Sequence, residues 1–276
     1  MKWEVIKMMK IRDYQITTKK EAELVIALVA DLHDQPYDDL LISFEKRNPD
    51  VIAVCGDLLY AAGKERNIFI EDFKGAQHLR DSKNALRFLE EIVSKYTVLF
   101  STGNHELHFD EGDCRLLNQL GVIFLDNQWC KVGQVLFGGL SSPFQYLKKE
   151  IPAKHMAKDE DLMFQIVETQ ELEWMNAFEK EEGFKVLLCH HPELYKPFLK
   201  ERNIDLILSG HTHGGQIRLL GRGIYAHKQG LFPQYDGGIY DNKLIISRGL
   251  ANTSKRVSRL CNPTELVYIT VEKGRE

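Results

Sequence analysis

Five short apolar runs punctuate the chain, and each one ends next to a polar motif. They are rich in Val, Ile and Leu and show no polar alternation, which is typical of strands buried on both faces. The runs cover residues 23–30, 51–55, 97–101, 185–189 and 204–209. Amphipathic helical patterns at 37–47 and 82–95 lie between them, so the order of elements predicts an α/β protein.

The rest of the chain predicts further strands, two hairpins, a long helix and one long connection. A strand and a hairpin turning at Val132-Gly133 are expected over 122–139, and a long helical pattern covers 155–180. Residues 239–247 read as a hairpin with Asp241-Asn242 at its turn, and 265–271 as a closing strand. The stretch 61–81 is longer than an ordinary connection and either packs on the body or walls the substrate pocket. Because no repeat or linker interrupts the chain, we expect a single domain over residues 1–276.

The polar motifs at the ends of the five runs are the candidate chemistry. In chain order they are Asp31-Leu32-His33, Gly56-Asp57, Gly103-Asn104-His105-Glu106, His190-His191 and Gly210-His211-Thr212-His213. Any one of them could be an ordinary turn, since Gly and Asn tolerate positive φ. However, six of the ten histidines fall at these positions. Ligands of open α/β sheets gather beyond the carboxyl ends of strands, so a shared site is the better interpretation.

Seven side chains in these motifs are suitable metal donors. Two divalent ions about 3.5–4 Å apart generate hydroxide at neutral pH and clamp phosphoryl oxygens, which is what hydrolysis of a phosphate ester requires. Because only two of the donors are carboxylates, a pair of divalent ions held by them keeps a net positive charge, which suits a phosphate ester. A site built for calcium would carry more carboxylates. The donors are Asp31, His33, Asp57, Asn104, His190, His211 and His213.

The motif set resembles the calcineurin-like metallophosphoesterase superfamily over nearly the whole chain. The strings GHTHGGQIRL and SRGLANTSKRVSRLCNPTELVYITV are similar to its bacterial branch of envelope-associated phosphodiesterases. The resemblance implies a four-layer α/β/β/α sandwich with two mixed sheets. It further implies that one metal is held by Asp31, His33 and His213, the other by Asn104, His190 and His211, and that Asp57 bridges them. In that scheme His105 binds no metal but contacts the phosphate and protonates the leaving oxygen.

One position departs from the family pattern. Many members read Gly-Asp-x-x-Asp in the second motif, whereas this chain has Gly56-Asp57-Leu58-Leu59-Tyr60. A phenol can hydrogen-bond but cannot stabilise an imidazolium as a carboxylate does, so the strength of His105 as an acid is open. Tyr60 and the nearby basic residue Arg218 are candidate substrate contacts.

The substrate class follows from the positive groups around the motifs. No arginine occurs within 103–113 or 210–216, which favours a phosphodiester or pyrophosphate over a dianionic monoester. A phosphomonoesterase, a nuclease and a non-catalytic metal-binding scaffold stay open as alternatives. A redox or metal-storage protein would need cysteine ligands or more carboxylates. The substrate would be a small or lipid-linked phosphoester, and the ligand set does not choose among Mn, Fe and Zn.

Composition limits the partners, the disulfide content and the cellular location to be expected of the protein. A formal charge of −4 gives no basic excess for bulk nucleic-acid binding. Five cysteines without CxxC spacing do not indicate a disulfide framework. No run approaches the ~20 apolar residues of a transmembrane segment, and charges break every apolar run of the N-terminus, unlike a secretory signal. A cytoplasmic location is therefore expected. Peripheral contact with a membrane and the oligomeric state are left open.

Overall fold

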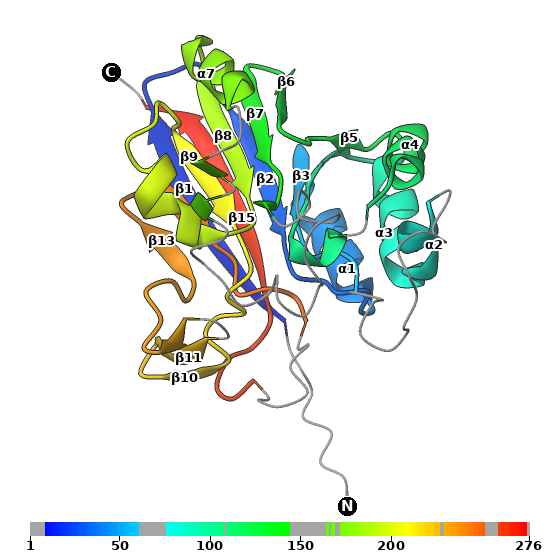
Figure 1. Cartoon of the computed structure of the whole chain (residues 1–276), viewed down its shortest axis with the longest axis vertical. Helices are drawn as coiled ribbons and strands as arrows, with labels where there is room; N and C mark the ends of the chain where they lie inside the picture. Colours follow the sequence, from blue (N-terminus) through cyan, green and yellow to red (C-terminus); the bar gives the residue numbers. More distant parts are fainter. Residues whose placement is uncertain are drawn as a thin grey trace, which may run out of the picture.

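Two six-stranded mixed sheets form the centre of the computed structural model (Figure 1). The structure describes residues 9–60, 76–107, 109–143, 164–165, 167–168, 172–226, 229–251 and 259–274. The first sheet has the order β1-β15-β2-β3-β4-β5, with β15 antiparallel to β2 and the other pairs parallel. Its strands are β1 (Lys10–Thr18), β15 (Glu265–Lys273), β2 (Leu24–Val29), β3 (Val51–Cys55), β4 (Thr97–Ser101) and β5 (Ile123–Phe124).

The second sheet has the order β13-β14-β9-β8-β7-β6 and is antiparallel only at its two outer pairs. Its strands are β13 (Gly238–Tyr240), β14 (Leu244–Ile246), β9 (Leu206–Ser209), β8 (Phe184–Cys189), β7 (Val135–Leu140) and β6 (Gln128–Val132). A small third sheet contains β10 (Ile217–Leu219), β11 (Arg222–Ala226) and β12 (Gly230–Leu231). It lies at one end of the molecule, beyond the two large sheets (Figure 1).

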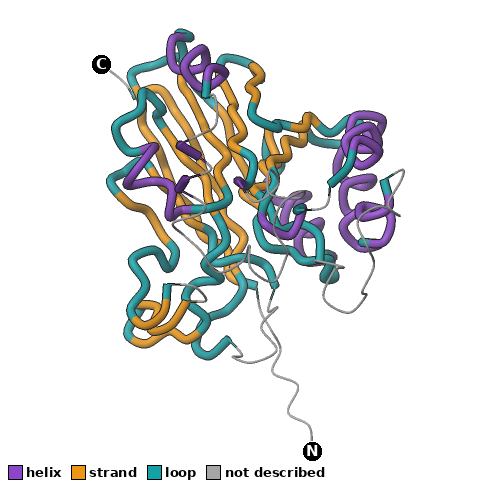
Figure 2. Tube along the Cα trace, viewed as in Figure 1, coloured by secondary structure: helices purple, strands orange, loops and turns teal. Residues whose placement is uncertain are grey.

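Helices cover the outer face of each large sheet (Figure 2). Phe44, Phe88 and Leu117 from α1, α3 and α4 pack against the first sheet, whereas Met175 and Phe178 of α7 pack against the second. Between the sheets, side chains such as Leu28 and Val186 form a third apolar cluster. The helices are α1 (Asp38–Arg47), α2 (Gln77–Asp81), α3 (Lys83–Val93), α4 (Glu111–Leu120) and α7 (Glu173–Lys180), with short turns η3 (Asn104–Glu106), η5 (Pro192–Leu194) and η6 (Tyr195–Leu199). The predicted α/β/β/α sandwich with two mixed sheets is confirmed.

The predicted elements match the structure where it describes them. The five apolar runs are β2, β3, β4, β8 and β9, and both predicted hairpins form, the second turning at Asp241 and Asn242 with positive φ. Most of the long stretch 61–81 and the first part of the helical pattern at 155–180 lie outside the described residues. Among the described elements, β1, α2, α4 and the small sheet were not predicted.

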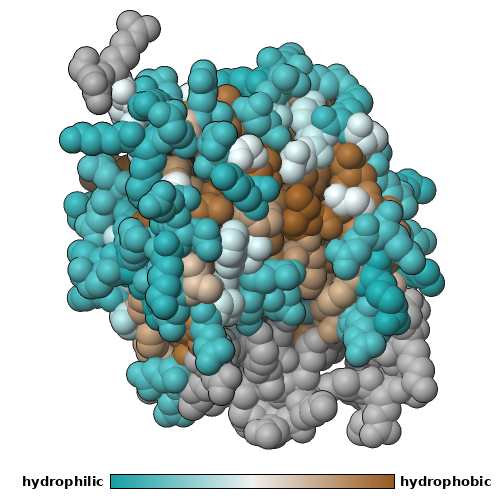
Figure 3. Space-filling view, turned by 90° about the horizontal axis from the view of Figure 1, so that it is seen from above, coloured by the Kyte–Doolittle hydropathy of each residue, from teal (hydrophilic) through white to brown (hydrophobic). Residues whose placement is uncertain are grey.

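The surface at the far end from the small sheet is mostly hydrophilic, with a band of hydrophobic residues between the polar ones (Figure 3). Among the described residues, no helix has both the length and the apolar character needed to cross a bilayer.

Candidate metal centre

All seven predicted donors lie just beyond the carboxyl ends of central strands from both large sheets. In the first sheet, β2, β3 and β4 lead into them, and in the second sheet β8 and β9 do so. The donors following β2 are Asp31 and His33, the one following β3 is Asp57, the one following β4 is Asn104, and those following β8 and β9 are His190, His211 and His213. The site therefore straddles the junction of the two sheets.

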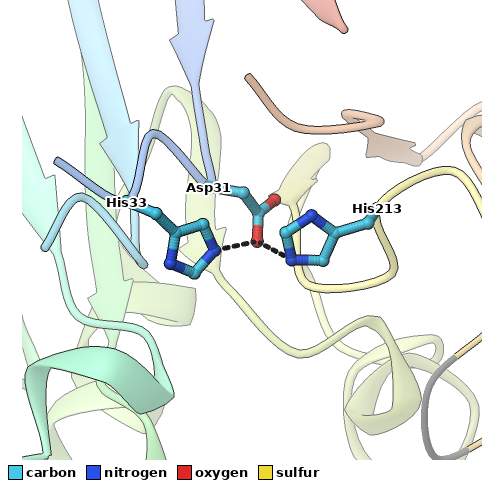
Figure 4. A group of neighbouring side chains, drawn as sticks. All are labelled: Asp31, His33 and His213. Carbon is cyan, nitrogen blue, oxygen red and sulfur yellow. Dashed lines mark ion pairs between the residues drawn. The ribbon is translucent and has the colours of Figure 1, made fainter. Parts of the chain in front are cut away.

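Asp31, His33 and His213 form the first group that could hold a metal ion (Figure 4). Their candidate ligand atoms all lie within 4.8 Å of one another. The Oδ1 atom of Asp31 is 3.8 Å from Nε2 of His33 and 3.4 Å from Nε2 of His213, so the carboxylate lies between two imidazole rings. One carboxylate and two imidazoles are suitable ligands for a divalent transition metal.

Asp57, His190 and His211 form a second group of the same kind. The Oδ2 atom of Asp57 is 3.3 Å from Nε2 of His190, and the same oxygen is 3.7 Å from Nε2 of His33 in the first group. Asp57 is thus the carboxylate placed between the two groups, which is the position that a bridging ligand needs.

Several donor atoms fit a role as metal ligands because they are buried and lack a hydrogen-bond partner among the described residues. These atoms include both ring nitrogens of His33, Nε2 of His190 and Oδ1 of Asn104. His190 donates its Nδ1–H to the backbone carbonyl of Cys55 at 2.8 Å, which leaves Nε2 turned toward Asp57. A second-shell hydrogen bond of this type fixes the tautomer and orientation of a metal-binding histidine.

Burial and mutual charge set the protonation of these groups. Burial lowers the pKa of His213 to about 3 and holds that of His33 well below its usual value, so both rings are neutral, as metal ligands must be. Burial, reinforced by Asp57 and opposed by His190, raises the pKa of Asp31 to about 7. Burial would lower the pKa of His190, but the carboxylate of Asp57 raises it to about 10. His190 would have to lose its Nε2 proton in order to hold a metal ion.

The backbone at the site is strained. Five of the seven predicted donors have left-handed φ angles, which are uncommon for residues other than glycine and cluster at functional sites. They are Asp31 (φ 55°), His33 (48°), Asp57 (52°), His211 (71°) and His213 (48°). Gly56 and Gly249 have positive φ as well, and a Cβ at Gly249 would lie 2.8 Å from the Cβ of Asp31. The glycines beside the donors therefore allow close backbone packing around the ligands.

Glu106 organises the loops that carry the ligands, a role that the sequence reasoning missed. This carboxylate is fully buried and accepts backbone N–H groups from Asp57 at 2.8 Å, Leu59 at 3.0 Å and Gly103 at 2.7 Å. Burial, together with the charge of Asp57, raises the pKa of Glu106 to about 7. It ties the loop after β3 to the loop after β4 and so fixes Asp57 relative to Asn104.

Replacing Glu106 with Gln should loosen this tie. The amide keeps one acceptor oxygen but turns an NH₂ group toward backbone donors, so buried N–H groups lose their partners at a cost of roughly 1–3 kcal/mol each. We expect a lower unfolding free energy in urea and a metal affinity reduced by about 10–100-fold, the usual effect of losing a ligand's support. Glu111→Gln is the matched control, because Glu111 is exposed on α4. Equal stability and metal affinity for Glu106→Gln and this control would show that Glu106 has no such role.

His105 and Tyr60 lie at the edge of the donor cluster. The Nε2 atom of His105 is 3.9 Å from Oδ2 of Asp57, and its ring packs edge-on against His33 with centroids 4.4 Å apart. Its backbone N–H donates to Oδ1 of Asp57 at 2.8 Å. Tyr60 is 42% exposed, and its ring centroid is 6.4 Å from that of His105. The structure thus places His105 against the donor cluster and Tyr60 beside His105.

Arg218 has a different position from the one that a substrate contact would take. It is buried, and its guanidinium donates to the backbone carbonyls of Gly214 at 2.8 Å and Asp236 at 2.7 Å and also to that of Gly221. These bonds make Arg218 a support for the loop after His213. We therefore give it no part in the proposed substrate contacts.

Arg259 is a second arginine near the candidate metal-binding groups. Its guanidinium donates to the backbone carbonyls of Gly249 at 3.2 Å and Arg248. Burial lowers its pKa to about 10, while the charge of Asp31 opposes that shift. The side chain lies far from the donors in sequence, so only the fold reveals that its charge acts on Asp31.

Comparison with known proteins places the chain in a family. A family model described as calcineurin-like phosphoesterase matches residues 24–215, and this chain belongs to that family. The matched range includes all seven donors and His105.

Several curated relatives of the chain are described as uncharacterized proteins. The chain is 28% identical over 204 residues to YpbG of Bacillus subtilis, covering 72% of this chain and 65% of that protein. It is 25% identical to an uncharacterized metallophosphoesterase of Aquifex aeolicus, covering 97% and 93% of the two chains. The chain spans about half to two thirds of the length of YpbG and of three metallophosphoesterases from Helicobacter pylori and Campylobacter jejuni. A dimetal phosphatase from Danio rerio is a structural neighbour with 14% identity and a TM-score of 0.44, covering 70% of this chain and 83% of its own.

Proposed function

We propose that this chain hydrolyses a phosphodiester or pyrophosphate bond with two divalent or transition-metal ions. The observation that carries the proposal is the placement of Asp57 within 3.3 Å of His190 and 3.7 Å of His33, which belong to different donor groups. Asp31, His33 and His213 would hold one ion, Asn104, His190 and His211 the other, and Asp57 both. When bound, such a pair supplies a hydroxide nucleophile at neutral pH and positive charge against the phosphoryl oxygens. Mn, Fe and Zn all suit this ligand set.

The protein's own contribution to the reaction centres on His105. In the proposed reaction, a bond forms between phosphorus and a water-derived oxygen while the bond from phosphorus to the leaving oxygen breaks. The leaving oxygen needs a proton, and a protonated His105 at the edge of the cluster transfers one to it. The Nε2 atom of His105 lies 3.9 Å from Oδ2 of Asp57, which places the imidazole beside the donor cluster.

The arginines described near the donors support a diester or pyrophosphate substrate over a monoester. A dianionic monoester needs several cationic side chains, but the two arginines discussed above, Arg218 and Arg259, donate to backbone carbonyls. The metals and His105 would then be the main positive groups that face the phosphate. A small or lipid-linked phosphoester with room for a second substituent fits this arrangement.

A comparison of two aryl substrates tests the substrate class. We expect kcat/KM for bis-nitrophenyl phosphate to equal or exceed that for nitrophenyl phosphate under one metal condition. A preference of about tenfold or more for the monoester would contradict the proposal and favour a phosphomonoesterase with the same metal centre. Hydrolysis of neither substrate by metal-loaded protein would instead favour a non-catalytic scaffold.

A cytoplasmic location is the second part of the proposal. All five cysteines are free, which suits a reducing compartment. Fractionation of cells that express the chain tests it, and recovery outside the cytoplasmic membrane would contradict it.

A further inference from the structure

The small sheet exposes large apolar side chains next to the metal centre. Leu220 is 97% exposed, Phe232 78% and Leu231 68%, while Leu219 and Leu260 are exposed to a similar degree. Within the described part of the chain, these five account for more than half of the exposed large hydrophobic residues. A cluster of this kind on one surface marks a site of interaction, whereas isolated exposed apolar residues need no explanation.

Strand pairing places part of this cluster on a single face. Leu260 bridges Ile217, Ile217 lies opposite Tyr225, and Tyr225 lies opposite Leu231. Directly paired residues project to the same side of a sheet, so these four form one row across it. The pairing register shifts between Ile217 and Arg218, and beyond the shift Leu219 is exposed while Arg218 is buried, so Leu219 lies on the open side of β10. We call this surface, with Leu220 and Phe232 at its edges, the β10–β12 apolar face.

The other face of the small sheet is anchored. Arg218 lies between Ile217 and Leu219 and projects to the opposite side, where it is buried and bonded to three backbone carbonyls. Its guanidinium also lies 3.4 Å from the Oδ2 atom of Asp236. These contacts hold the sheet in a fixed orientation, so the apolar face is presented by an organised element.

Charge around the face is one-sided. No Asp or Glu occurs between Asp205 and Asp236, so the strands β10, β11 and β12 carry no acidic side chain. Arg222 is exposed and lies opposite Leu219 in the pairing, so a cation borders the apolar row. The rest of the chain is correspondingly acidic, because the whole protein has a formal charge of −4. Exposed apolar side chains bordered by cations are complementary to an anionic lipid surface.

The β10–β12 apolar face is also connected to the candidate metal centre by a short stretch of chain and by two hydrogen bonds. β10 begins four residues after His213, and the amide of Asn262 donates to the carbonyl of His213 at 2.7 Å and to that of Gln216 at 3.3 Å. We propose that the β10–β12 apolar face docks on the surface of an anionic lipid bilayer and holds the metal centre beside it. The sheet lies at one end of the molecule, where it can meet a flat surface before the body does (Figure 1).

Flotation of the full chain with lipid vesicles tests this docking without relying on any enzymatic activity. We expect binding to vesicles containing phosphatidylglycerol, weaker binding to pure phosphatidylcholine, and loss of binding as salt rises. Leu220→Ser combined with Phe232→Ser should weaken binding by at least about tenfold, since two large apolar side chains are removed from the interface. Arg222→Glu should reduce binding only to the anionic vesicles.

Ile42→Ser is the matched control, because Ile42 is also an exposed apolar residue but lies on α1. It should bind vesicles like the unaltered chain. The Leu220→Ser/Phe232→Ser protein should keep its circular dichroism and its hydrolysis of soluble bis-nitrophenyl phosphate. Absence of vesicle binding by the unaltered chain, or equal binding by this variant, would overturn the proposal. So would ultracentrifugation showing a dimer that the variant loses, because the face would then join two copies of the chain.

Discussion

Asp57→Ala should remove both metal ions and, with them, all measurable hydrolysis. The Oδ2 atom of Asp57 lies 3.3 Å from Nε2 of His190 and 3.7 Å from Nε2 of His33, closer to His190 than the 4.0 Å of Oδ1 of Asp31. Without it the second group loses its only carboxylate, and the first loses the ligand that links it to the second. We expect the affinity for both ions to fall by more than about 100-fold, because even indirect supports of ligands are worth about 10–100-fold.

His213→Ala is the comparison that makes this prediction specific. His213 belongs only to the group with Asp31 and His33, so its loss should weaken one ion and leave the other bound. Elemental analysis of both variants after dialysis gives the two stoichiometries directly. Loss of a single ion from Asp57→Ala would contradict the bridging role.

His105→Ala should reduce turnover by about 10²–10⁴-fold while leaving the metal content unchanged. The reason is that, in the proposed reaction, His105 would act on the leaving oxygen from the edge of the cluster, whereas the groups containing Asp31 and His190 would hold the ions. The deficit should shrink for substrates with good leaving groups such as nitrophenol, which need little protonation. The measurement is kcat for a series of diesters of increasing leaving-group pKa.

Tyr60→Asp is a further variant to measure with the same series of diesters. It introduces the carboxylate that the family resemblance implies at this position, where the phenol ring of Tyr60 now has its centroid 6.4 Å from that of His105. Turnover on poor leaving groups should rise if a carboxylate strengthens His105 as an acid. A His105→Ala protein that has lost metal would show that His105 is a ligand and that its proposed role is wrong.

The strands and the donor set could be predicted because both leave a local signature in the sequence. A strand buried on both faces must be a continuous apolar run, as Val51–Cys55 is, and the donor that follows it is the next polar residue. β1 gave no such signal, because this strand lies at a sheet edge, carries Lys10, Arg12 and Asp13, and needs little apolar surface to pair with β15.

Other features depend on contacts between distant segments. Glu106 was visible in the sequence, but its three backbone partners come from two loops that only the fold brings together. The left-handed backbone at Asp31 and His211 has no residue signature, since neither is glycine. Arg218 was expected as a substrate contact from its nearness to His213 in sequence, yet strand alternation turns it into the protein.

The metal stoichiometry of the unaltered chain is the most direct test of the central claim. Apo protein, prepared by chelation, is titrated with Mn²⁺ while bound metal and hydrolysis of bis-nitrophenyl phosphate are followed together. The two donor groups joined by Asp57 predict two ions per chain and activity that appears as the second ion binds. Saturation at one ion per chain, or activity that persists in the chelated protein, would contradict a binuclear phosphoesterase.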